Sequence, residues 1–292
     1  MEQLTAPQPP ATAAPEYAPD TIRLEKTSGF RRVLSPRELW RYRDLAFQIA
    51  ARDVTIRYRQ TAFGAAWAIL QPVAFMIIFT FVFGHAAGIS TDSDVPYAIF
   101  SLTALVPWMF VANSFLLSSE SLVLNQALIS KIYFPRIFIP AGVVAAGCVD
   151  FTIGLSILIA VILVYGIVPP ISILMLPVLI AIAIATVLGA GTALSAINVR
   201  YRDVRYVVPF ASQMWLFLTP VVYPTSTLSQ PLQTISAINP MTGVVEGFRW
   251  ALLGTGSAPW DLIGISAVAA VVLLFAGLTY FDRVERSFAD LI

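Results

Sequence analysis

The stretch Arg52-Asp53-Val54-Thr55-Ile56-Arg57-Tyr58-Arg59-Gln60-Thr61, followed by Gly64-Ala65-Ala66-Trp67, decides how the rest of the chain is organised. The sequence before this stretch is charged. The sequence after it is apolar for about 20 residues, the length that crosses a bilayer as a helix. Its arginines stand directly before the apolar segment, where they can meet anionic lipid headgroups. The stretch therefore predicts the border between the cytosol and a first membrane span.

The composition indicates a membrane protein of several helices. Of the 292 residues, 58% are hydrophobic and 12% are charged, and the mean hydropathy is +0.78. Soluble domains carry about 25% charged residues. We therefore predict an all-α polytopic membrane protein. A net charge of +1 argues against a nucleic-acid partner. The single Cys148 and the single His85 leave no cluster for a metal, so we expect no metal site and no cofactor of the chain's own.

Two segments precede the first span. Residues 1–34 are rich in proline, with five prolines in the first 20 residues, and predict a disordered cytosolic tail. Residues 35–62 predict an amphipathic helix at the membrane interface, which starts at Ser35 with a capping box to Glu38 and ends at about Arg59. The alternative is a surface helix of a small soluble cap. The predicted apolar face of the helix at residues 35–62 consists of Leu39, Trp40, Leu45, Phe47, Ile49, Val54 and Ile56.

Residues 63–292 predict a domain of six transmembrane helices. No apolar signal-peptide region precedes Phe63, so we expect the first span to direct the chain to the membrane. The predicted fifth span is short, with Pro209 and Pro220 near its ends. The six predicted spans are Phe63–Phe83, Tyr97–Leu117, Ile137–Gly166, Ile171–Ile197, Val207–Tyr223 and Leu262–Phe281.

The lysines and arginines predict the orientation of these spans. With six spans, all 18 of them except Arg249 fall on one side of the membrane. Because basic residues favour the cytosolic side, both termini are expected in the cytosol.

Two segments between the spans have unusual composition. The segment at about 226–256 is too apolar for a free loop, and Asn239–Pro240 and Gly243 interrupt it. We predict two short re-entrant or periplasmic helices there, with Glu246 and Arg249 placed to pair. The segment at about 120–135 is cytosolic and yet apolar, and it predicts a short helix that ends at Pro135. It is either a docking surface for a partner chain or a helix lying on the membrane or the bundle.

Catalytic motifs are absent from the sequence. It contains no G-x-x-x-x-G-K-[ST], so this chain is not expected to hydrolyse a nucleotide. Asp150 is the only carboxylate deep inside a predicted span, and it is expected to face a polar interior or a subunit contact. The many aromatic residues in the spans could stack on sugar rings along a pore or serve packing and lipid contact.

Five motifs in order, over about residues 35–290, resemble those of the ABC-2-type permeases that export polysaccharides such as O-antigen, teichoic acid and galactan. Gln71 stands where many members have Asn, and the proline-rich tail is not general. The motifs are Arg52-Asp53-x-x-x-Arg57-Tyr58-Arg59-Gln60-Thr61-x-x-Gly64-x-x-Trp67 with Gln71-Pro72, Asn125-x-x-Leu128-Ile129-x-Lys131-x-x-Phe134-Pro135, Asn198-Val199-x-Tyr201-Arg202-Asp203-Val204, Thr219-Pro220-Val221-x-Tyr223-Pro224, and Asn239-Pro240 with Glu246-x-Phe248-Arg249.

The resemblance implies a transport subunit in the bacterial cytoplasmic (inner) membrane. It would form a homodimer with two separate P-loop ATPase subunits, which bind the ATP, and would move a glycan linked to a polyprenyl-pyrophosphate lipid. Coupling to the ATPase would use Asn125, Leu128, Ile129, Lys131 and Phe134. A pyrophosphate would arrive at Arg52, Arg57, Tyr58 and Arg59, although anionic-lipid anchoring explains these residues equally well.

The resemblance also implies a translocation path and an external gate. The path would include Trp67, Phe75, Trp108, Phe115 and Trp215. The gate would include Thr219, Pro220, Tyr223, Asn239, Glu246 and Arg249. Two alternatives stay open: a permease of the same type for drugs or small lipids, and a membrane enzyme acting on lipid-linked sugars, for which Asp92 and Asp94 are the only tight acidic pair.

Overall fold

The computed structural model describes residues 40, 42–59, 66–89, 95–131 and 134–285, and within these residues the chain is helical without any strand. The predicted tail at 1–34, the helix start at Ser35 and the acidic pair Asp92 and Asp94 lie outside the described residues. The elements are α2 (Arg43–Tyr58), α3 (Trp67–Phe79), the π-helical η2 (Thr80–Ala86), α4 (Tyr97–Leu124), α5 (Gln126–Lys131), α6 (Phe138–Val164), η3 (Ile171–Met175), α7 (Leu176–Arg200), α8 (Val204–Leu218), η4 (Thr225–Thr227), α9 (Gln230–Ile238), α10 (Pro240–Leu253) and α11 (Trp260–Glu285).

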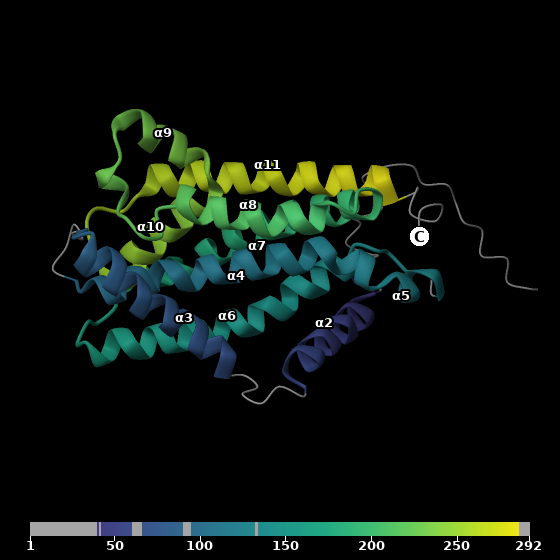
Figure 1. Ribbon diagram of the computed structural model, residues 1–292, viewed down its shortest axis with the longest axis horizontal. Coiled ribbons are helices and arrows are strands. Elements are labelled where there is room, and N and C mark those ends of the chain that lie inside the picture. Colours follow the sequence, from purple (N-terminus) through teal and green to yellow (C-terminus); the bar gives the residue numbers. More distant parts are fainter. Residues whose placement is uncertain (1–39, 41, 60–65, 90–94, 132–133, 286–292) are drawn as a thin grey trace, which may run out of the picture.

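Long helices run side by side along the longest axis of the molecule (Figure 1). The short helices α2 and α5 lie at one end of this bundle, and α9 and α10 lie at the other (Figure 1). Five segments are long and apolar enough to cross a membrane, which confirms the multi-pass helical fold. They are Trp67–Ala86, Tyr97–Leu124, Phe138–Val164, Ile171–Arg200 and Trp260–Glu285.

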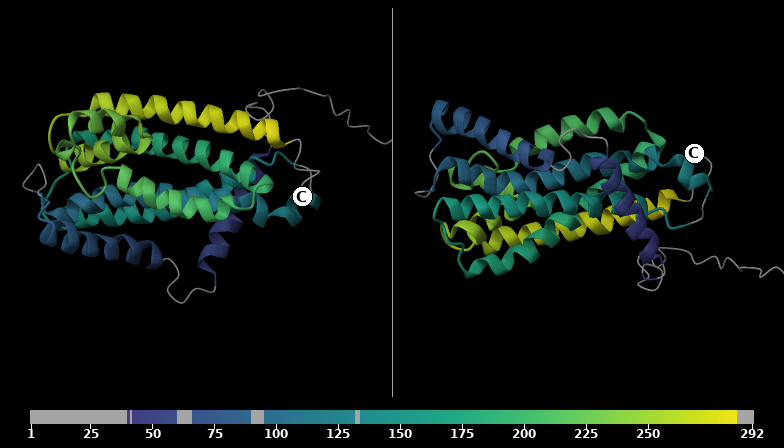
Figure 2. Two further views of the ribbon diagram at one scale, coloured as in Figure 1. Left: turned by 45° about the horizontal axis from the view of Figure 1, so that its top comes forward. Right: turned by 90° about the horizontal axis from the view of Figure 1, so that it is seen from below.

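The predicted fifth span has a shorter helix than the others. Helix α8 has 15 residues and ends at Leu218, before the predicted end of the span at Tyr223. Thr219 has extended backbone angles because it precedes Pro220, and a residue before proline disfavours the α conformation. At 1.5 Å per residue, α8 spans roughly 22 Å, less than the hydrocarbon core of about 30 Å. It nevertheless lies along the bundle (Figure 2), and the count of six crossings stays a prediction.

Helix α4 extends further toward the end of the bundle that carries α2 and α5 than predicted. It ends at Leu124 rather than Leu117, so that the predicted helix at 120–135 is reduced to the six residues of α5. The polar run of serines after Leu117 does not end the helix. Ser119 donates to the Leu116 carbonyl and Ser121 to the Ser118 carbonyl, so these hydroxyls are satisfied by the helix's own backbone.

The apolar residues of α2 do not share one face, contrary to the prediction. Ile49 is only 4% exposed and packs against Gly142 of α6, whereas Phe47 is 74% exposed. Positions i and i+2 on a helix are rotated by about 200° from each other, so Phe47 points away from α6 when Ile49 faces it. The helix therefore rests on the bundle with one face and carries exposed apolar side chains on the other.

Helices α9 and α10 confirm the prediction of two short helices, and Asn239–Pro240 is the break between them. Their re-entrant or periplasmic placement stays a prediction. The Asn239 side chain accepts a hydrogen bond from the Met241 amide at 3.0 Å, and Pro240 occupies the first turn. Gly243, predicted as a second break, instead lies inside α10. A Cβ atom there would be 2.7 Å from the Leu262 carbonyl carbon, so Gly243 allows close contact with α11.

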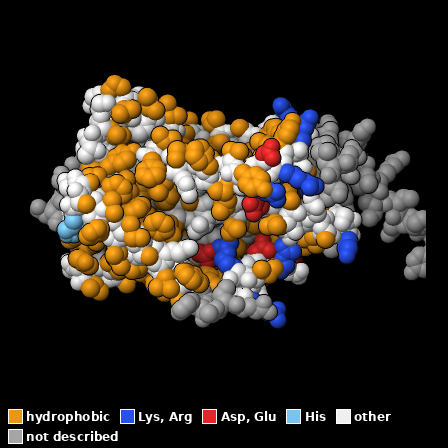
Figure 3. Space-filling view, in the orientation of Figure 1, with side chains coloured by type: hydrophobic (Ala, Val, Ile, Leu, Met, Phe, Trp, Pro, Cys, Tyr) orange, Lys and Arg blue, Asp and Glu red, His pale blue; other side chains and the backbone are white. Residues whose placement is uncertain are grey.

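Charged side chains gather at the end of the bundle that carries α2 and α5, and the opposite end is largely apolar on the face seen in Figure 3. Outside α10, all described lysines and arginines lie on or directly after α2, on α5, in the segment before α6, at or beside the α7–α8 connection and near the end of α11. This distribution agrees with the sequence-based orientation, in which that end faces the cytosol.

Candidate functional site

A cavity of about 740 Å³ lies near the charged end of the bundle, between α2, α3, α4 and α6. Its polar lining comes from all four helices, and its apolar lining comes mainly from α3, α4 and α6. The polar residues are Arg52, Asp53, Arg57, Tyr58, Gln71, Asn113, Ser114, Ser121, Asn125 and Asp150, and the rings are Trp67, Phe110 and Phe151.

An ion pair forms one wall of the cavity. Arg57 of α2 pairs with Asp150 of α6, and the hydroxyl of Tyr58 donates to the same carboxylate. Burial and this hydrogen bond raise the pKa of Tyr58 to about 12, so the phenol stays protonated as the donor at neutral pH. Asp150 therefore faces a polar interior, as expected for a carboxylate inside a span.

A second arginine connects α2 to the C-terminal end of α4. The Arg52 guanidinium lies 2.8 Å from the carboxylate of Asp53 and donates to the Asn125 side chain, also at 2.8 Å. Asn125 in turn donates to the Ser121 carbonyl at 2.8 Å. The first two motifs of the sequence, 73 residues apart, thus meet in one hydrogen-bonded chain.

Three of the four residues predicted to meet a pyrophosphate, namely Arg52, Arg57 and Tyr58, line this cavity. Arg59 is exposed and lies outside the lining. The cavity therefore holds two guanidinium groups, each paired with a carboxylate of the lining, beside aliphatic and aromatic walls. This combination can bind an amphipathic anion, with the acid group at the arginines and the apolar part along α3, α4 and α6.

The residues predicted to couple to an ATPase differ in how far they are exposed to a partner. Ile129 and Phe134 are buried in a cluster with Ile49 and Phe281, so they attach this segment to the bundle. Leu128 is half-buried, and Lys131 is exposed. Asn125 is held by Arg52. Of the five, only Lys131 is fully available to a partner, and the exposed Leu124 joins it.

A smaller cavity of about 340 Å³ lies beside this segment. It is lined by residues of α4, Gln126 of α5 and residues around the α7–α8 connection, among them Arg202 and Arg205. Asn198 at the end of α7 donates to the Ser119 carbonyl at 3.0 Å. The second and third motifs are therefore neighbours at the charged end of the bundle.

The predicted path aromatics do not line one surface within this chain. Trp67 and Phe75 are exposed on α3. Trp108 and Phe115 are buried in the core, and both make edge contacts with the half-buried Trp215 of α8, at ring-centroid distances of 5.6 and 5.5 Å. The assignment of all five to a translocation path stays a prediction.

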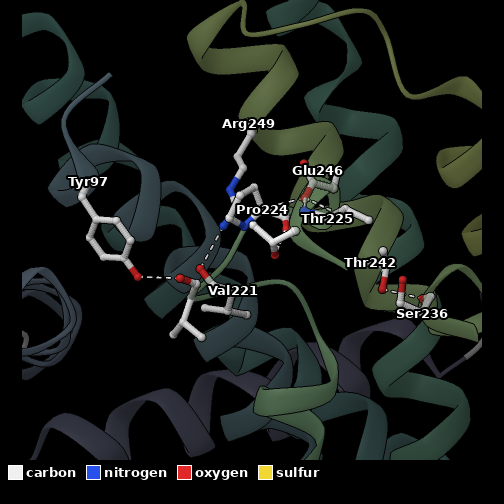
Figure 4. Close-up of polar contacts among 10 residues, drawn as sticks. Tyr97, Val221, Pro224, Thr225, Ser236, Thr242, Glu246 and Arg249 are labelled. Atoms are coloured by element: carbon white, nitrogen blue, oxygen red, sulfur yellow. Dashed lines mark hydrogen bonds and ion pairs between the residues drawn. The ribbon is translucent and has the colours of Figure 1, made fainter. Parts of the chain in front are cut away.

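The predicted gate residues meet at the opposite end of the bundle, and Figure 4 shows two of them, Glu246 and Arg249. The predicted pair is confirmed: Arg249 lies 3.1 Å from Glu246. Arg249 is 2% exposed, donates to the Val221 carbonyl at 2.9 Å and lies 3.6 Å over the centre of the Phe100 ring. Glu246 accepts from the hydroxyl of Thr225 at 2.5 Å.

The segment at residues 219–225, to which Val221 and Thr225 belong, also makes hydrogen bonds with two further parts of the chain. Tyr97 of α4 donates to the Val222 carbonyl at 2.6 Å (Figure 4). Asn239 donates to the Thr219 hydroxyl and accepts from the Trp215 indole, both at 2.9 Å. Pro220 is buried, and Tyr223 is half-buried and donates to the Phe217 carbonyl. The gate residues therefore form one polar cluster around residues 219–225.

Sequence reasoning missed the partners of Asp150 and the role of α4 in the cavity. Gln71 stands out in the sequence only as a departure from a motif, and Asn113 and Ser114 belong to none of the five motifs. One signal could have found them, because a polar side chain at bilayer depth must face protein or a polar cavity.

The fold and this site together define a multi-pass helical membrane protein with an amphipathic cavity open near its cationic end. A model of the family described as ABC-2 type transporter matches residues 45–253, so the chain belongs to this family.

Several curated relatives match nearly their full length. The chain is 28% identical to the "O-antigen export system permease protein RfbA" of Myxococcus xanthus, over 88% of this chain and 98% of the relative. It is 27% identical to the RfbA protein of Klebsiella pneumoniae, over 85% and 95%. It is 22% identical to the "Polysialic acid transport protein KpsM" of Escherichia coli, over 81% and 92%.

Proposed function

We propose that this chain is the transmembrane subunit of an ATP-binding-cassette exporter that moves a lipid-linked polysaccharide across the bacterial cytoplasmic membrane. The family match and the names of the relatives, which are export permeases for O-antigen and a transport protein for polysialic acid, support the class of passenger.

The observation that carries the proposal is the combination of charges and walls in the larger cavity. Arg52 and Arg57 offer planar guanidinium groups, which bind phosphate oxygens in pairs. The apolar side chains of α3, α4 and α6 continue from them. A polyprenyl pyrophosphate has this chemistry, with two anionic phosphates joined to a long hydrocarbon chain.

Export in this proposal is driven by separate ATPase subunits, which bind the ATP. Two copies of the chain form a homodimer, with the termini in the cytosol. The exposed Lys131 and Leu124 are the contact with the ATPase. The bond from Arg52 to Asn125 connects that contact to the cavity, so a movement of α5 displaces an arginine of the lining. Opening at the far end then requires movement of the segment around residues 219–225.

The test is a charge-removal variant in cells that also contain the ATPase subunit. The double variant Arg57→Gln with Asp150→Asn removes both charges, so that neither charged group is left without its partner. We expect the ATPase to remain associated, while surface glycan measured by immunoblot falls about tenfold or more, since positioning contacts of this kind act on transport rather than assembly.

The matched control is Arg43→Gln with Asp44→Asn, a pair on the same helix outside the cavity, which should export normally. The proposal is wrong if the purified chain associates with no ABC ATPase of its own cell, or if the cavity variant exports as well as the control. Export of a small lipid or drug in place of a glycan would favour the alternative passenger.

A further inference from the structure

The C-terminal end of α11 is joined to the segment that leads from α5 into α6. The Arg136 guanidinium donates a hydrogen bond to the Glu285 carbonyl at 2.8 Å, and the Glu285 carboxylate accepts one from the Arg136 amide at 3.2 Å. Glu285 is the last described residue of α11, and a cation is favoured at the C-terminal end of a helix, where carbonyl groups accept side-chain hydrogen bonds. We call this contact, between residues 149 positions apart, the C-terminal joint.

Apolar packing surrounds the C-terminal joint. Phe134 and Ile137 lie beside Arg136 in the sequence, and Leu278 and Phe281 belong to the last turns of α11. All four apolar side chains are at most 7% exposed and belong to one buried cluster. Because side chains in such a cluster are packed closely, a displacement of the segment around Arg136 also displaces the end of α11.

The other end of α11 is attached to α10 and to the residue before it. The amide of Gly243 in α10 donates to the Ser266 hydroxyl at 2.9 Å, and that hydroxyl donates to the Asn239 carbonyl at 3.4 Å. A Cβ atom on Gly243 would lie 2.7 Å from the Leu262 carbonyl carbon, so the backbones of α10 and α11 are in close contact. The side chain of Asn239 in turn donates to the Thr219 hydroxyl at 2.9 Å. The N-terminal part of α11 is therefore connected to the polar cluster of predicted gate residues.

Helix α11 runs between these two attachments without a break. It follows the length of the bundle as one α-helix from Trp260 to Glu285 and contains no proline (Figure 1). Ser266 and Glu285 are 19 positions apart, which corresponds to roughly 28 Å along a helix. Helix α4 also reaches both ends of the bundle, but Pro107 removes a backbone hydrogen bond inside it. An unbroken helix held at both ends can carry a displacement from one end to the other.

We propose that α11 transmits the movement of the α5 segment to the gate, and that Arg136 and Glu285 are positioning residues of this coupling. The inference rests on the proposed function, in which an ATPase contacts the chain near α5 and the gate opens at the far end. It adds the route between these two events. When the ATPase moves α5, the C-terminal joint shifts α11, and Ser266 passes the shift to α10 and Asn239. Neither residue of the joint lines the larger cavity, so the joint acts on coupling and not on binding of the passenger.

The test measures ATP-induced movement at both ends of α11 in the complex of the full chain with its ATPase, reconstituted in lipid nanodiscs. Spin labels are attached in separate Cys148→Ser proteins, one at Ser130→Cys in α5 and one at Ser229→Cys, four residues after the segment at 219–225. With the joint intact, ATP should change the spectra of both labels. Arg136→Ala should preserve the response in α5 and reduce the response at Ser229→Cys about fivefold or more, because the coupling between the two sites is lost.

Matched variants separate the joint from general damage to the protein. Arg136→Lys keeps a cation that can bond to the Glu285 carbonyl, and Glu285→Gln keeps an oxygen that can accept from the Arg136 amide, so both should retain most of the response at Ser229→Cys. Glu285→Ala removes that acceptor and should lower the response, though less than Arg136→Ala, because the guanidinium still bonds to the carbonyl. The control is Arg283→Ala, which removes an exposed arginine from the last turn of α11 and should leave both responses unchanged.

The possible results distinguish this inference from the proposed function. If both labels respond to ATP, and Arg136→Ala behaves like Arg283→Ala, the role of the joint is refuted and the proposed function stands. The same follows if only the label in α5 responds while the joint is intact. If Arg136→Ala does not assemble with the ATPase, Glu285→Ala is compared with Glu285→Gln, and equal responses at Ser229→Cys refute the joint. If ATP moves neither label while the joint is intact, the ATP-driven step of the proposed function is refuted, and the joint is refuted with it.

Discussion

The contribution of an arginine to stability depends on how deeply its side chain is buried, as Arg249 and Arg43 illustrate. Arg249 is nearly fully buried, with a carboxylate, a backbone carbonyl and an aromatic ring around it. Arg43 pairs with Asp44 at 3.6 Å on the surface, with half or more of each side chain exposed. Because desolvation strengthens a charge pair and also raises the cost of losing a partner, the two arginines should contribute very differently to stability.

We expect Arg249→Met to lower the free energy of unfolding by about 3–5 kcal/mol, because Glu246 is then left without its cation. Arg43→Met should change it by about 0.5 kcal/mol or less. Thermal unfolding of the purified chain in detergent, followed by intrinsic fluorescence, measures both. Equal effects of the two substitutions would show that Arg249 does not hold the segment at 219–225.

Helices α7 and α11 approach each other through glycines. A Cβ atom on Gly189 would lie 2.6 Å from the Leu273 carbonyl carbon, and one on Gly277 would meet the Gly189 carbonyl oxygen. The backbones are thus in direct contact, as small residues allow in membranes. Gly264, also on α11, has nothing within 4 Å of the corresponding position.

Gly277→Ala should destabilise the chain by about 1–3 kcal/mol, because the two helices must move apart. Gly264→Ala should be neutral or stabilise by up to about 1 kcal/mol, because alanine favours the helical state. The melting temperature of each variant in the same detergent decides between these outcomes. A lower melting temperature for Gly264→Ala than for Gly277→Ala would contradict the close packing of α7 on α11.

The molecule has a cationic end and an apolar end. Five segments are long enough to cross the membrane between these ends, and a sixth crossing depends on α8. Helix α8 lies beside the long helices (Figure 2) but is too short to span by itself. Its exposed side chains include Val207, Phe210 and Phe217, which suit lipid or a second copy of the chain.

We predict that Ser130 in α5 and Ser229 before α9 lie on opposite sides of the membrane. Each can be changed to cysteine in a Cys148→Ser background, which removes the one native thiol. A membrane-impermeant maleimide should label Ser229→Cys in spheroplasts and Ser130→Cys only after permeabilisation. If both positions are labelled from one side, α8 does not complete a crossing.

Much of the fold could be predicted because hydropathy depends on composition alone. A helix that crosses a bilayer must be long and apolar, so a running average of hydropathy detects the spans that begin near Tyr97 and Phe138. Asn239–Pro240 marks a helix boundary by local chemistry. The Glu246–Arg249 pair follows from helical spacing. Hydropathy alone misplaces the ends of α4 and α8. Helix α4 continues through a polar run because the serine hydroxyls bond to its own backbone, and α8 ends early because Thr219 precedes Pro220.

The sequence by itself thus determined the helical membrane fold, the cationic end and the arginines that stand at it. The tertiary structure decided which groups meet. Arg57 reaches Asp150 across 93 residues, and Ser114 faces Gly147 on another helix. Such contacts depend on how whole helices pack, and packing depends on the shapes of many distant side chains together. No local pattern of residues carries that information.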